Sequence, residues 1–153
     1  MIAAVALILH SLAAVVWVGG MFFALVVLRP ASGPLEPGPR LELWSRVLGR
    51  FFAWVIAAIV LLLASAYAVI FAVYGGFRGI PLHIQIMQGI GIIMMLAFFH
   101  LYFAPWRRFR AALARQDYPA AGQQLAQIRA IVTVNLILGL ITVAVGGSGR
   151  YWG

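Results

Sequence analysis

Four long apolar segments constrain this chain more than any other feature. Hydrophobic residues fill 65% of its 153 positions, and they gather in blocks that approach or exceed the roughly 20 residues needed to cross a bilayer. Hydrocarbon offers the backbone no hydrogen-bonding partner, so such blocks must be helices. We predict an all-α integral membrane protein, a single domain over residues 1–153 with four transmembrane helices in an antiparallel bundle. The expected helices cover about residues 2–28, 43–74, 82–104 and 119–147.

The arginines are distributed unevenly over the connections between these segments. Nine lie in or beside the first-to-second and third-to-fourth connections, whereas Arg78 and Arg150 lie on the other side. The positive-inside rule then puts the arginine-rich connections in the cytoplasm and both termini outside. The net charge of +8 therefore reflects orientation in a membrane and does not indicate nucleic-acid binding.

The composition excludes several kinds of chemistry. Cysteine is absent, which rules out disulfides, thiolate metal sites, iron–sulfur clusters and covalently attached haem. The carboxylates are Glu36, Glu42 and Asp117, all in or beside the cytoplasmic connections. The membrane segments thus contain no carboxylate pair for acid–base work, and no Ser–His–Asp arrangement or phosphate-binding loop is present. Hydrolytic chemistry is not expected.

His10 is the most informative polar residue inside an apolar segment. On a helix, Trp17 and Met21 fall within roughly 20° of His10, and alanines surround that line. A rise of about 1.5 Å per residue puts His10 roughly 8 Å outward of the midplane. The same arithmetic puts His83 roughly 16 Å outward and His100 roughly 10 Å inward. Ionisable groups in hydrocarbon are costly unless they are used, so His10 is a candidate ligand with His83 as its partner.

Two cofactors suit these residues. Two neutral imidazoles from neighbouring helices fit haem b, with His10 and His83 as its ligands. Imidazole and thioether groups also suit Cu(I), because Met87 and Met94 fall within about 40° of His83 on a helix. The candidate metal ligands are His10, Met21, His83, Met87, Met94 and, for a second, inner site, His100.

A family resemblance rests on several short motifs. His10-x6-Trp17-x-Gly19-Gly20 on the first helix resembles the CopD family of bacterial copper-resistance proteins and the related HemJ-type proteins. The supporting motifs are Leu28-Arg-Pro, Leu82-His83, His100 with Pro105-Trp-Arg-Arg108, and Asn135-Leu-x2-Gly139-Leu. The resemblance implies a four-helix unit of the bacterial inner membrane with periplasmic termini. It also implies a role in copper handling beside periplasmic partners, or in haem b chemistry, and it adds Trp17 and Gly20 to the candidate cofactor-binding residues.

One departure from the HemJ pattern limits the enzyme assignment. HemJ-type proteins carry a lysine shortly after the helix-three histidine, whereas position 85 here is Gln and the chain contains no lysine. Protoporphyrinogen oxidase activity is therefore not expected.

Three hypotheses remain. The leading one is a cytochrome-b-like protein in which His10 and His83 hold haem b for electron transfer with quinone or a periplasmic redox protein. The second is copper uptake or transfer across the inner membrane. The third is a non-catalytic assembly or partner subunit, in which the histidines only hydrogen-bond across helices and a small-residue stripe on the fourth helix can face another chain. That stripe comprises Asn135, Gly139, Thr142 and Gly146. A homo-oligomer is a further possibility.

Overall fold

The computed structural model describes residues 1–152 without the side chain of Arg150, so Gly153 of the predicted domain lies outside it. The elements are α1 (Ile2–Phe22), the π-helical η1 (Phe23–Leu28), α2 (Arg29–Ala31), α3 (Pro37–Tyr74), α4 (Leu82–Phe103), α5 (Pro105–Ala114), α6 (Tyr118–Ser148) and the 3-10 turn η2 (Gly149–Tyr151). Four helical segments in this range are long and apolar enough to cross a membrane. The prediction of an all-α chain with four possible membrane spans is confirmed.

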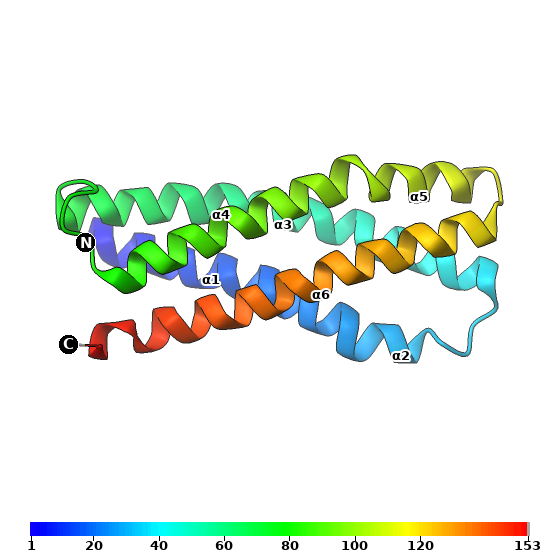
Figure 1. Cartoon of the computed structure of the whole chain (residues 1–153), viewed down its shortest axis with the longest axis horizontal. Coiled ribbons are helices and arrows are strands. Elements are labelled where there is room, and N and C mark those ends of the chain that lie inside the picture. Colours follow the sequence, from blue (N-terminus) through cyan, green and yellow to red (C-terminus); the bar gives the residue numbers. More distant parts are fainter. Residues whose placement is uncertain (153) are drawn as a thin grey trace.

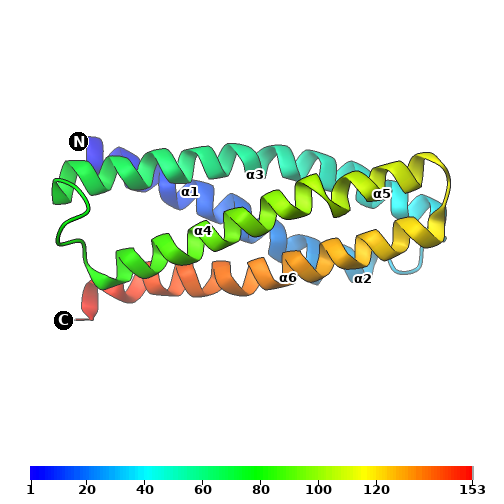
Figure 2. The same cartoon turned by 45° about the horizontal axis from the view of Figure 1, so that its top comes forward.

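Both termini lie at the same end of the molecule (Figure 1). The connections at residues 32–36 and 115–117 lie at the opposite end, beside α2 and α5. We refer to the first as the terminal end and to the second, which carries nine of the eleven arginines, as the arginine end. α1 packs along α3, α4 packs along α6, and α1 also contacts α6. Figure 2 shows α1 and α4 running diagonally between α3 and α6.

Two helix boundaries differ from those expected from the sequence. α3 begins at Pro37 rather than near residue 43. Proline suits the first turn of a helix, because the N–H that it lacks would have no acceptor within the helix there. The third segment continues beyond residue 104 as α5, after a break at Ala104 that Pro105 imposes by lacking an N–H. α5 packs along α6, and its Trp106 and Phe109 are buried.

An aromatic cluster joins three of the four long segments. The ring centroid of Phe52 on α3 lies 5.5 Å from that of Phe98, 6.2 Å from that of Tyr102 and 5.1 Å from that of Trp106. Trp17 of α1 reaches Phe98 edge-on at 6.3 Å. Such edge-to-face pairs add to the stabilisation from buried area. The cluster therefore anchors α1, α3 and α4–α5 to one another toward the arginine end.

α6 approaches its neighbours through glycine. A Cβ atom added to Gly139 would lie 2.8 Å from a methyl carbon of Val18 and 3.2 Å from that of Met94, so a larger residue would force these side chains apart. One turn away, Nδ2 of Asn135 donates to the carbonyl oxygen of Met94 at 3.0 Å. Asn135 therefore bonds across helices, whereas the hydroxyl of Thr142 donates to the carbonyl oxygen of Leu138 in α6 itself, at 2.8 Å. Within this chain, Gly139 of the stripe faces α1 and α4, and Gly146 faces Met87 of α4.

We predict that Gly139→Val destabilises the protein by about 1–3 kcal/mol, the usual cost of overpacking a close-packed interface. Gly147→Val in the same helix is the matched control, because nothing lies within 4 Å of a Cβ atom added there. Unfolding of both variants in detergent, followed by circular dichroism, measures the difference. Equal losses in the two variants would contradict the assigned role of Gly139.

Candidate functional site

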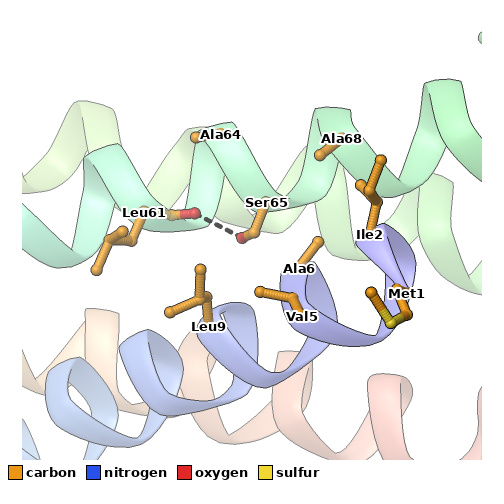
Figure 3. A pocket seen from close by; sticks show the side chains of 9 residues that line it. All are labelled: Met1, Ile2, Val5, Ala6, Leu9, Leu61, Ala64, Ser65 and Ala68. Atoms are coloured by element: carbon orange, nitrogen blue, oxygen red, sulfur yellow. Dashed lines mark hydrogen bonds between the residues drawn. The ribbon is translucent and has the colours of Figure 1, made fainter.

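His10 is held by a hydrogen bond to the neighbouring helix. Its ring is half-buried on α1, and its Nδ1 atom lies 3.0 Å from Oγ of Ser65 on α3. Ser65 is only 5% exposed. Its hydroxyl is directed to the carbonyl oxygen of Leu61 and also lies 3.2 Å from that of Leu62 (Figure 3). The ring of His10 therefore has a defined partner in the α1–α3 interface.

This arrangement assigns the tautomer of His10. A serine hydroxyl has one hydrogen, and that of Ser65 is donated to its own helix in the backbone-bonded manner common for helical serine. When the Ser65 hydrogen is donated to Leu61, Nδ1 of His10 is the donor in the bond between them and Ser65 Oγ is the acceptor. The neutral ring consequently carries a lone pair on Nε2, on the side away from Ser65. A metal-binding histidine is oriented in the same way, by a hydrogen bond from its other ring nitrogen.

An apolar groove lies beside Ser65, between α1 and α3 at the terminal end (Figure 3). Its volume is about 450 Å³, and its wall consists of Met1, Ile2, Val5, Ala6, Leu9, Leu61, Ala64, Ser65 and Ala68. Only the serine in this wall is polar. The groove is therefore suited to hydrocarbon, such as a lipid chain, and not to a charged ligand.

His83 lies against the C-terminal turn. A Cβ atom added to Gly149 would lie 2.3 Å from Cγ of His83, so the ring packs directly on that glycine. The ring of Trp152 meets His83 edge-on, with centroids 6.4 Å apart. His10 thus bonds to α3, whereas His83 is covered by residues 149–152, and these contacts do not pair the two imidazoles.

The methionines on the His83 face of α4 pack on the glycines of α6. A Cβ atom added to Gly146 would lie 2.9 Å from the methyl carbon of Met87, and one added to Gly139 would lie 3.2 Å from that of Met94. Met21 of α1 reaches the same point, 3.6 Å from the Gly139 position. The structure therefore brings Met21 and Met94 together, while Met87 lies farther along α6.

The remaining candidate residues either pack against neighbouring helices or are exposed. Trp17 is 3% exposed and belongs to the aromatic cluster. Gly20 lies under the ring of Phe51, where a Cβ atom would overlap the ring. His100 is exposed on the last turn of α4. Trp17 and Gly20 therefore contribute to the close packing of α1. His100 lies in the last turn of α4, at the opposite end of that helix from His83.

Packing changes along the bundle. Toward the arginine end, large apolar side chains from every long segment form one buried cluster. At the terminal end, the described residues 2–12, 60–93, 140–149 and 151–152 include five buried ones: Ala6, Ser65, Ile70, Ile80 and Gly149. His10 and His83 lie half-buried in this second region. The histidines are thus located where few residues are buried, outside the large apolar cluster.

Sequence reasoning missed the importance of Ser65. Its only signal was a hydroxyl in an apolar helix, a signal that it shares with Ser11, which is exposed. Another polar atom also stands out: Oδ1 of Asn135 is buried and has no hydrogen-bond partner among the described residues. Within the same residues, no group of three or more histidine and carboxylate side chains could hold a metal ion.

Comparisons with protein-family models, with curated proteins and with solved structures found no match. The resemblance to the CopD and HemJ families therefore rests on the sequence motifs alone.

We predict that His10 and Ser65 are energetically coupled by about 0.5–1.5 kcal/mol, the typical net value of one hydrogen bond. A double-mutant cycle with His10→Leu and Ser65→Ala, read from unfolding in detergent, measures this coupling. The matched cycle uses Ser11→Ala, because Ser11 is exposed on α1. If the effects of His10→Leu and Ser65→Ala were additive, the hydrogen bond would not contribute.

Proposed function

We propose that this chain is a CopD/HemJ-like membrane protein that binds haem b through Nε2 of His10 and acts in electron transfer. The observation that carries the proposal is the hydrogen bond from His10 Nδ1 to Ser65. It orients the ring and leaves the nitrogen that ligates iron unprotonated.

Small side chains flank His10 along its face of α1. Ala6 and Ala13, one turn on either side along the same face, are buried and small. Haem b would carry most of its own iron ligands, so the chain would need to contribute only one or two histidines, with His10 as the first. His83 is the proposed second ligand. Its ring would have to turn away from Gly149 to serve.

The roles of the chain's residues follow from this arrangement. Bound haem would supply one-electron redox chemistry. His10 would hold the iron, and Ser65 would act as a positioning residue that tunes the basicity of the ring. The carboxylates Glu36, Glu42 and Asp117 belong to the connections near the arginine end, so the histidine region has no acid–base pair. This favours electron exchange with quinone or a periplasmic redox protein over proton-transfer catalysis.

The proposed setting is the bacterial inner membrane, crossed by an antiparallel bundle with both termini in the periplasm. Nine arginines belong to the end opposite the termini, which supports this orientation through the positive-inside rule. His10 and His83 would then lie in the periplasmic half of the bilayer.

We predict that the protein purified after expression with adequate haem shows a Soret absorption band that is lost in His10→Ala. Ser65→Ala should retain haem and raise its reduction potential, because the ligand loses the acceptor for its Nδ1–H and donates less electron density to iron. Absorption spectra with a redox titration measure both effects.

His100→Ala is the control for this experiment, since His100 is exposed on the last turn of α4. Its spectrum should match that of the unmodified protein. The haem proposal is wrong if the unmodified protein has no Soret band, or if His10→Ala leaves the band unchanged.

Copper transfer is a second candidate function, favoured by the meeting of Met21 and Met94 at Gly139. Two buried thioethers from different helices are soft donors of the kind that Cu(I) prefers. These methionines also fill the core, as methionine commonly does. Their contact at Gly139 is therefore compatible with haem binding at His10 as well.

If copper is the cargo, Met21→Leu/Met94→Leu should reduce copper accumulation in cells to the level of the empty vector, because leucine keeps the volume and removes the sulfur. Met95→Leu, which changes a half-buried neighbour outside this pair, is the control. Metal analysis of washed cells measures the effect, and unchanged accumulation in the double variant would exclude the pair as a copper path.

A further inference from the structure

Three arginines converge on one pocket at the arginine end. The pocket has a volume of about 340 Å³ and is lined by Arg29, Ser32, Gly33, Arg40, Leu41, Gly122, Leu125 and Arg129. The arginines come from α2, α3 and α6, so segments up to a hundred residues apart in sequence build it. The convergence is therefore a tertiary feature and not a run of basic residues.

The charge of this pocket is not neutralised by the protein. The positive charges of Arg29 and Arg40 both repel the positive charge of Arg129. Among the described residues, one ion pair forms, between Arg46 and Glu42, and it lies outside the pocket. No described carboxylate lies within ion-pairing distance of the three arginines. Like charges held together repel one another unless an anion joins them.

The pocket is held in shape by hydrogen bonds around Ser32 and Gly33. Ser32 is 2% exposed, and its Oγ accepts a hydrogen bond from Nε1 of Trp44 at 3.1 Å. The same hydroxyl donates to the carbonyl oxygen of Arg29 at 3.1 Å. Nη1 of Arg40 donates to the carbonyl oxygen of Gly33 at 3.5 Å. The turn that carries Arg29 is thereby fixed to α3, so the guanidinium groups are presented by an ordered frame.

The pocket also has room for a ligand beside an apolar floor. Leu41 and Leu125 in its wall are buried. Nothing lies within 4 Å of a Cβ atom added to Gly122, so the space above this glycine is open. Arg29 directly follows the apolar stretch of the first span, and Arg129 lies where the apolar part of the fourth begins. The pocket is therefore located where a bilayer would present its phosphate groups.

We propose that Arg29, Arg40 and Arg129 form a binding site for a phosphate group of net negative charge, provided by an anionic phospholipid headgroup or by a soluble phosphate. Guanidinium groups bind phosphate through paired, charge-assisted hydrogen bonds, and anionic lipids are enriched on the cytoplasmic side of membranes. The site is independent of His10 and of any haem or copper bound at the other end.

The test is a lipid titration of the purified full chain in neutral detergent, read by native mass spectrometry. Phosphatidylglycerol should bind at least about tenfold more tightly than phosphatidylcholine, since one arginine near a membrane surface contributes about fivefold. Arg29→Gln/Arg40→Gln/Arg129→Gln should abolish this preference. Gly122→Leu should also abolish it with every charge retained, because the side chain would fill the pocket.

The matched control is Arg107→Gln/Arg108→Gln/Arg115→Gln, which removes the same charge from exposed arginines outside the pocket and should keep the preference. Glycerol 3-phosphate and inorganic phosphate are added as competitors. Displacement of lipid by either one identifies a soluble phosphate as the ligand, and failure to displace identifies the headgroup. The proposal is overturned if the unmodified protein binds both lipids equally, if the pocket variants keep the preference, or if the control loses it.

Discussion

The close approach of α6 to α1 and α4 at Gly139 is the contact on which the rest of the bundle depends. Without a side chain at this position, Val18 and Met94 meet the backbone of α6, and Asn135 bonds to the carbonyl oxygen of Met94 one turn away. In a membrane the hydrophobic effect does not drive helices together, so packing and hydrogen bonds of this kind must do so. The approach brings α6 into contact with both α1 and α4.

This packing determines which side chains remain for chemistry. The face of α4 that carries Met87 and Met94 is used against the glycines of α6, and His83 continues the same row onto Gly149. His10 is treated differently, because α1 turns it toward Ser65 of α3 and leaves Nε2 with its lone pair. The histidines are therefore not equivalent: His10 is hydrogen-bonded to α3, and His83 is packed against the C-terminal turn.

Much of the fold follows from local sequence, whereas the site follows only in part. The four apolar segments were visible because mean hydropathy over a span needs no knowledge of the partner helix. The face of His10 was also predictable from helical periodicity, and its line of Ala6, Ala13, Trp17 and Met21 is buried. The partner Ser65 was not predictable, since periodicity gives the face of a helix but not which residue of another helix lies at the same height.

The sequence by itself determined that this chain is helical and apolar enough to cross a membrane four times, and that its arginines gather at one end. These properties depend on the solvation of each segment separately. The tertiary structure alone decided that His10 meets Ser65, that Met21 meets Met94, and that Arg29, Arg40 and Arg129 share one pocket. The reason is that the rotation and relative height of neighbouring helices come from side-chain packing between distant segments, at positions such as Gly139.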